Sequence, residues 1–406
     1  MSISLDRASD LPPRERRATA RLAPLAFIPA LDGVRGVAIV AVMLHNFSGI
    51  GEPPTRLSHV FEWGWTGVQL FFVLSGFLIT RILLEAGRSP GVLRAFLARR
   101  VLRIVPLYFA TLAVYFFVVP LLFDAPTVVA AEHNQLWYWL FLSNWGDPLG
   151  FGAPGLQHLW SIAVEIQFYL LWPFVALGAS DRRLRRLCFT LIFLSLVSLI
   201  GIRFGWGSSS SAVYKFTVTR MSAPVIGGLV ALVTKRRAWC ALYMRHRVAL
   251  GWTTAGALLV LVAWRHGLQH TDPAVQTIGY ALVALLFAQW LLTIVLGLPA
   301  LGGAMLSLPS WRPLRVVGRL SYGMYILHYP LHWAAMKPLS PWLLAGPWSP
   351  LRQLGYIAVA MAVTTGLAQV SWMFFERYFI ALKRHFPVPR GGIGETPEPI
   401  IRTFVS

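Results

Sequence analysis

The sequence contains few charged residues. Only 13% of its 406 residues are Asp, Glu, Lys or Arg, whereas 56% are hydrophobic and the mean hydropathy is +0.60. About a quarter of the residues of an ordinary soluble domain are charged, so this composition excludes that class. Apolar runs of roughly 18 to 23 residues recur between Val34 and Phe375, and each could cross a ~30 Å hydrocarbon core as a helix.

Regular alternation of polar and apolar residues is also absent from these runs, which argues against a membrane β-barrel. We therefore predict an all-α integral membrane protein, a bundle of about ten transmembrane helices. The expected spans are roughly 34–50, 64–84, 104–123, 158–178, 187–205, 217–234, 248–264, 275–297, 316–335 and 353–375. No convincing internal repeat is visible, which weakens a reading as an inverted-repeat transporter.

Acidic residues are scarce: 16 Asp and Glu stand against 36 Lys and Arg, for a net charge of +20. With the N-terminus placed in the cytoplasm, 29 of the 36 basic residues fall on the inner side of the expected spans and 7 on the outer side. This is the positive-inside asymmetry, and it predicts that both termini are cytoplasmic. The positive charge is thus explained by topology, and no nucleic-acid partner is expected.

The chain is expected to form one membrane domain. Residues 1–28 are predicted to be a basic cytoplasmic tail, 29–380 the transmembrane domain and 381–406 a second cytoplasmic tail. The aromatic run 136–145 is too short to span, and it should lie in the interface or dip into the protein. Cys188 and Cys240 lie at or near inner loops, where no disulfide is expected.

Two ionisable residues mark the first span, where such residues are costly and suggest function. Arg35 lies near its inner end, and His45 follows about 15 Å further along, which places it near mid-membrane. His45 is either a structural histidine or a general base, since neutral imidazole can accept a hydroxyl proton. Asp32 is expected to cap the helix N-terminus.

The fourth span carries a polar stripe. At 100° per residue, His158, Ser161, Glu165 and Tyr169 share one helix face, which must face the bundle interior or a wet cavity. The predicted depths of Glu165 and His45 allow the carboxylate to orient the imidazole. The alternative is that Glu165 only ties helices together.

Three arginines lie at inner helix ends. Arg100 and Arg103 are three residues apart and share a helix face, which suits a phosphate-bearing ligand or an anionic lipid. Arg81 ends the second span, where it binds a ligand or reaches to the interface. In the middle of that span, Ser75 and Gly76 permit close approach of a helix or an extended ligand.

Taken together, these segments resemble the acyltransferase-3 family of membrane O-acyltransferases. The resemblance covers residues 28–380 and rests on motifs in the expected order: LDGVRG with His45, GVQLFFVLSGFLITR, ARRVLRIVPLY, HLWSIAVEIQFYLLWP, VGRLSYGMYILHYPL and FFERYF. It implies a ten-helix domain that takes an acyl group, with acetyl favoured, from cytoplasmic acyl-CoA as co-substrate, with no permanently bound cofactor. The implied acceptor is a hydroxyl of a surface or exported glycan, or of a small metabolite.

Carried over by position, the resemblance makes His45 the catalytic base, with Glu165 as its candidate carboxylate. Arg35, Arg81, Arg100 and Arg103 become acyl-donor contacts. Apart from the resemblance, their places on the second span and on the polar stripe make Ser75, His158, Ser161 and Tyr169 candidate substrate contacts. It also implies a multi-pass protein of the bacterial cytoplasmic membrane, in contact with membrane lipids.

The sequence departs from the family pattern at three positions: Gln69 replaces an acid, Ile166 replaces a common second Glu, and Tyr378 replaces a Pro in the closing motif. Arg220 and Glu376 match looser family positions, and His328 is either a packing and hydrogen-bonding residue or a functional one. A transporter or flippase of a glycan or acylated intermediate remains an alternative, as does a scaffold subunit with a decayed site. No metal-ligand cluster is visible, so no metal is expected.

Overall fold

The computed structural model describes residues 28–48, 61–122, 131–205, 210–298, 308–336 and 349–388, and within these ranges the chain forms helices and no strands. By length and composition, nine of the described helices could cross a membrane, against the ten or so that the sequence predicts. The expected span 316–335 is represented by α18 (Arg312–Leu331), which is not among the nine and carries Arg312, Arg315 and Arg319 in its first half. Most of the two expected tails lies outside the described residues.

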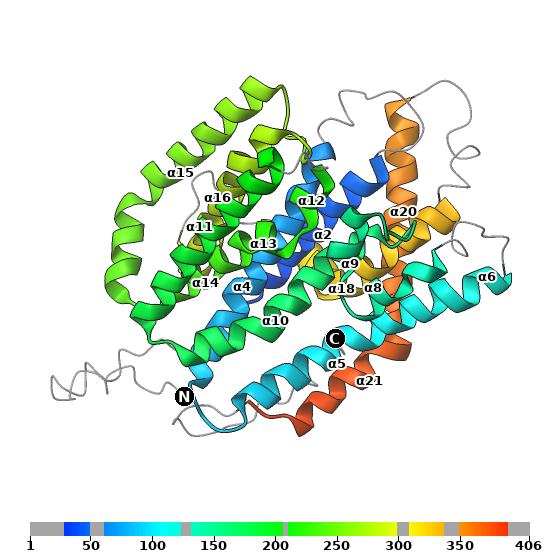
Figure 1. Ribbon diagram of the computed structural model, residues 1–406, viewed down its shortest axis with the longest axis horizontal. Helices are drawn as coiled ribbons and strands as arrows, with labels where there is room; N and C mark the ends of the chain where they lie inside the picture. The colour runs from blue at the N-terminus through cyan, green and yellow to red at the C-terminus, as the bar shows by residue number, and fades with distance from the viewer. Residues whose placement is uncertain are drawn as a thin grey trace, which may run out of the picture.

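The long helices form one bundle (Figure 1). Besides α18, they are α2 (Ala30–Ser48), α4 (Thr66–Ala86), α5 (Val92–Ala113), α10 (Trp160–Gly178), α11 (Asp181–Gly205), α14 (Ser222–Thr234), α15 (Arg237–Arg265), α16 (Tyr280–Val295) and α20 (Pro350–Ser371). Figure 1 shows α15 along one margin, which agrees with its many exposed apolar side chains. On a membrane protein, such a face is suited to lipid contact.

Three helices begin well before the expected spans. α5 begins at Val92, α11 at Asp181 and α15 at Arg237, each within a stretch rich in arginine. Hydropathy detects only the lipid-buried part of a helix, whereas arginine is itself a good helix former. Arg100 and Arg103 therefore lie within a regular helix. We call the end of the bundle that holds these residues the basic end.

Glycines bring α2 and α18 into backbone contact. A Cβ atom at Gly318 of α18 would overlap the carbonyl oxygen of Asp32 and lie 2.8 Å from the backbone nitrogen of Gly36. On α2, a Cβ at Gly36 would lie 2.9 Å from the carbonyl carbon of Leu314. Small residues permit this approach in membrane helices, where close packing drives association.

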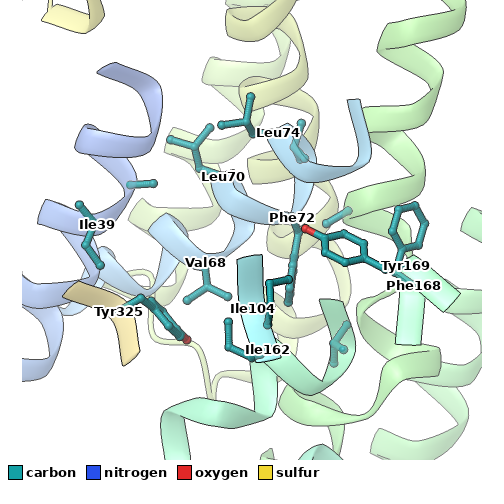
Figure 2. Packing of buried hydrophobic residues seen from close by; sticks show 14 of the residues in the cluster. Ile39, Val68, Leu70, Phe72, Leu74, Ile104, Ile162, Phe168, Tyr169 and Tyr325 are labelled. Atoms are coloured by element: carbon teal, nitrogen blue, oxygen red, sulfur yellow. The ribbon is translucent and has the colours of Figure 1, made fainter. Parts of the chain in front are cut away.

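The pair α4 and α14 is packed in the same way, through Gly76 against Pro224 and Gly227 against Val73. Around α4, buried side chains of α2, α5, α10 and α18 form the main apolar core (Figure 2). The side chains drawn include Val68, Phe72 and Tyr169. The expected close approach at Gly76 is thus present, with α14 as the neighbour.

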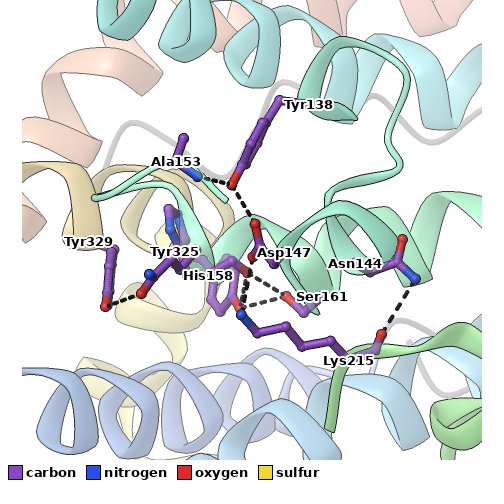
Figure 3. Close-up of polar contacts among 10 residues, drawn as sticks. Tyr138, Asn144, Asp147, Ala153, His158, Ser161, Lys215, Tyr325 and Tyr329 are labelled. Atoms are coloured by element: carbon purple, nitrogen blue, oxygen red, sulfur yellow. Dashed lines mark hydrogen bonds and ion pairs between the residues drawn. The ribbon is translucent and has the colours of Figure 1, made fainter. Parts of the chain in front are cut away.

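The segment that contains the aromatic run folds over the end opposite the basic end. It includes α8 (Gln135–Trp139) and α9 (Ser143–Gly146), and Tyr138, Ser143 and Asn144 are buried, so the run dips into the protein as predicted. Tyr138 donates a hydrogen bond of 2.6 Å to Asp147, which also pairs with Lys215 at 3.2 Å (Figure 3). Burial raises the pKa of the Asp147 carboxyl, and the lysine opposes this shift.

Candidate functional site

A cavity of about 90 Å³ runs between α2, α4, α5, α10 and α18. Its polar lining residues come from every one of these helices: Arg35, Ser75, Arg100, Arg103, Ser161, Glu165, Tyr169, Ser321, Tyr322 and Tyr325. Seven of the ten predicted site residues are therefore brought to one cavity. Arg81, His45 and His158 do not line it.

Glu165 lies at the centre of the cavity's polar wall. Its carboxylate accepts a hydrogen bond of 2.6 Å from the Ser75 hydroxyl and another from the Tyr169 hydroxyl. The guanidinium carbon of Arg100 lies 5.3 Å from the centroid of the Tyr169 ring, within the range of a cation–π contact. The stripe predicted on α10 thus faces the interior, and at Glu165 it meets α4 and α5.

The basic end of the cavity is formed by Arg35, Arg100 and Arg103. Arg35 pairs with Asp32 at 2.5 Å. The expectation that Asp32 caps the helix is wrong, because α2 already begins at Ala30 and the carboxylate is used in this pair. Arg81 pairs instead with Glu85, one turn along its own helix, at 2.8 Å.

At the other end of the cavity, Ser161 and Tyr325 are joined by a hydrogen bond of 2.5 Å between their hydroxyls (Figure 3). Behind them, the His158 ring lies 5.1 Å from that of His328. The His328 Nε2 atom is 2.9 Å from the side-chain nitrogen of Asn46, next to His45 in sequence. This buried network thus connects the cavity to the last turn of α2.

His45 lies in that last turn, not in the middle of its helix. The described helix runs from Ala30 to Ser48, and the expected end of the span at residue 50 lies outside the described residues. The structure does not bring His45 to Glu165: the His45 ring packs edge to face against His270, with centroids 5.7 Å apart. The buried Nδ1 atom of His45 has no hydrogen-bond partner among the residues described.

His45 nevertheless lies close to the end of the cavity. Gly64 packs on it, since a Cβ at Gly64 would lie 2.9 Å from that of His45. Val68, four residues further along the helix Trp63–Ala86, lines the cavity. Four residues are about one helical turn, or roughly 6 Å. His45 is therefore about one turn beyond the cavity.

Arg220 is 1% exposed and has no carboxylate partner within the described ranges. Its Nη2 atom donates a hydrogen bond of 2.8 Å to Gln69, the residue that replaces an acid of the family pattern. Its guanidinium carbon also lies 4.4 Å from the ring centroid of Tyr280 and 5.0 Å from that of Tyr214. This charge is held by aromatic faces and a neutral amide.

Sequence reasoning assigned no role to Tyr325, Tyr322 or His270. The two tyrosines fall in a motif that carries the family resemblance, so that motif could have identified them. His270 is a single histidine in an expected loop, and no spacing or periodicity distinguishes it. Among the described residues, no group of three or more His, Cys, Asp and Glu side chains could hold a metal ion.

Comparison with known proteins places this cavity in a family context. Residues 28–372 match a family described as an acyltransferase domain. The YrhL protein of Bacillus subtilis, provisionally named a peptidoglycan O-acetyltransferase, is 31% identical over 377 residues, covering 86% of this chain and 54% of YrhL. The peptidoglycan O-acetyltransferase OatA of Listeria monocytogenes is 28% identical, covering 86% of this chain and 55% of OatA.

A third relative, the O-acetyltransferase OatA of Staphylococcus aureus, is 28% identical over 75% of this chain and 50% of its own length. The chain thus spans about half the length of the curated relatives it matches. No solved structure matches the chain.

Proposed function

Because the chain belongs to this acyltransferase family, we propose that it is a multi-pass membrane O-acyltransferase that moves an acyl group, acetyl first among the candidates, from acyl-CoA to a glycan hydroxyl. The named relatives support acetyl transfer, since each is named an O-acetyltransferase. Two of them are named for peptidoglycan, which makes a cell-wall or other exported glycan the first acceptor to test. A small-metabolite hydroxyl is the second.

The donor is proposed to enter at the basic end. Arg35, Arg100 and Arg103 converge there on one cavity, and guanidinium groups bind phosphate oxygens through paired hydrogen bonds. The positive-inside distribution predicts that this end faces the cytoplasm, where acyl-CoA is available. Arg81 is excluded from this group in the proposal, because Glu85 already pairs with it.

The single observation that carries the proposal is the path of the cavity from these arginines to Val68, one helical turn from His45. About 90 Å³ is far smaller than the ~300–1,000 Å³ of typical ligand pockets. Such a passage suits a slender thioester arm better than it suits a sugar ring. The acceptor would therefore reach His45 from the side of the bundle opposite the basic end.

In this mechanism His45 removes the proton of the acceptor hydroxyl, and the oxygen attacks the carbonyl carbon of the thioester. The carbon–sulfur bond breaks, and the proton passes from His45 to the departing CoA sulfur. Glu165, held by Ser75 and Tyr169, helps to position Arg100 and the donor arm rather than His45.

Nothing favours the transporter alternative, since the reported relatives are named as acetyltransferases. The test is acetyl transfer from labelled acetyl-CoA in membrane vesicles that expose the basic end. Wild-type vesicles should label a glycan product, and His45→Ala vesicles with equal protein content should not. Full labelling by His45→Ala would overturn the base assignment, and uptake of the glycan without labelling would support transport.

A further inference from the structure

A second histidine faces His45 from another part of the chain. His270 lies in the segment between α15 and η7 (Val275–Gly279), outside the expected spans. The two imidazole rings are 5.7 Å apart at an interplanar angle of 89°, so that the edge of one ring meets the face of the other. This contact restricts rotation of the His45 side chain, whose buried Nδ1 atom has no other partner among the described residues.

The backbone that carries His270 is held by three side chains from separate elements. The Trp65 indole donates a hydrogen bond of 2.7 Å to the carbonyl of Leu268. The carbonyl of His270 itself accepts bonds from the Tyr280 hydroxyl at 2.7 Å and from the Gln276 amide at 3.0 Å. A segment fixed in this way holds its side chain in a set orientation, as is required of groups that support a reactive centre.

The surroundings of His270 also disfavour its protonation. Its ring lies 4.7 Å from Tyr214, and Arg220 lies on that same tyrosine. Burial, the charges of His45 and Arg220 and, more weakly, Lys215 lower the pKa of His270 to about 4. The half-buried Glu62 is the one acidic group that acts on the pair among the described residues, and it acts on His45.

We propose that His270 is a positioning residue for acyl transfer: a neutral imidazole that holds the His45 ring in the orientation in which it accepts the acceptor's proton. This inference rests on the proposed function, because it takes His45 as the base. His270 neither gains nor loses a proton in the reaction. The proton moves from the hydroxyl to His45 and on to the CoA sulfur as the carbon–sulfur bond breaks. His270 only orients the His45 ring and, as a neutral group, adds no charge beside it.

The test places different charges at position 270 and measures the acidic limb of the pH–rate profile, which reports protonation of the base. At the observed ring separation, one charge should move this limb by about 0.5 to 2 pH units. His270→Asp should move it to higher pH and His270→Arg to lower pH. His270→Gln should leave the limb in place while lowering kcat about tenfold, with the KM for acetyl-CoA unchanged.

The matched control is His266, an exposed histidine at the start of the same loop, where φ is 54°. Asp and Asn tolerate this left-handed backbone. His266→Asp introduces the same charge in the same segment without facing His45, so it should leave both the limb and kcat unchanged.

A second measurement does not depend on turnover. Diethyl pyrocarbonate modifies neutral imidazole, so the pH dependence of His45 modification, followed by peptide mass spectrometry, titrates this residue directly. The curve should move to higher pH in His270→Asp and to lower pH in His270→Arg, and it should coincide with that of the wild type in His270→Gln.

Coincident modification curves in all three variants would overturn the inference even if acetyl transfer and the need for His45 were confirmed. Displaced curves in a protein with no transferase activity would instead support the facing pair and contradict the proposed function. Equal kcat for His270→Gln and wild type would refute the positioning role.

Discussion

Replacing Gly318 by alanine tests the packing that fixes α2. A Cβ at this position would overlap the carbonyl oxygen of Asp32 and lie 2.6 Å from its carbonyl carbon. Both are backbone atoms, so no side chain can rotate away, and α18 must move from α2 by about 1 Å. A gap of that size forfeits up to about half of each dispersion contact along the interface. With overpacking typically costing 1–3 kcal/mol, we expect a loss of about 3 kcal/mol for Gly318→Ala.

The assay is thermal unfolding of the purified protein in detergent, followed by tryptophan fluorescence at a fixed scan rate. A loss of this size should lower the apparent Tm by roughly 3–4 °C. Gly366→Ala on α20 is the matched control, because a Cβ there would meet no atom within 4 Å. The control should be neutral or slightly stabilising, since alanine favours helix by up to about 1 kcal/mol. An unchanged Tm for Gly318→Ala would refute the close packing of α2 on α18.

Three further predictions concern charge. Arg100→Lys keeps the charge but loses the paired hydrogen bonds, so the KM for acyl-CoA should rise about tenfold in steady-state kinetics. Arg99 does not line the cavity, so Arg99→Lys should leave the KM for acyl-CoA unchanged. Asp147→Asn leaves the half-buried Lys215 unpaired and should cost about 3 kcal/mol, the low end for a buried pair, measured by denaturation. Wild-type stability would contradict the pair. The lowered pKa of His270 means that the unfolded chain binds a proton first, so stability should fall by up to about 3 kcal/mol from pH 6.5 to pH 4. The loss of stability over this pH range should be smaller in His270→Gln than in the wild type. An equal loss in both proteins would assign the pH dependence to groups other than His270.

Helical periodicity was enough to predict the polar wall of the cavity. Ser161, Glu165 and Tyr169 recur at four-residue intervals, and the structure places all three on the cavity. Arg100 and Arg103 follow the same rule on α5. Spacing along one helix determines which residues share a face, so these features depend on local geometry alone.

The partners across helices could not be predicted in this way. Equal depth in two helices allowed a contact between His45 and Glu165, but depth does not specify rotation about the helix axes. Rotation is set by the glycine contacts of Gly36 and Gly318, which no hydropathy profile records. His270 contacts His45 from a loop, where neither the helical nor the strand periodicity predicts the direction of a side chain.

The close packing of α2 on α18 also fixes the distance between Arg35 and His45. Arg35 and His45 are ten residues apart on one continuous helix, which sets them about 15 Å apart along its axis. Because α2 cannot bend or slide without breaking backbone contacts with α18, the distance between Arg35 and His45 stays constant. In the proposed mechanism, a donor is accepted only if its reactive carbon lies at the matching distance from its phosphates, and any opening that admits or releases it comes from other helices.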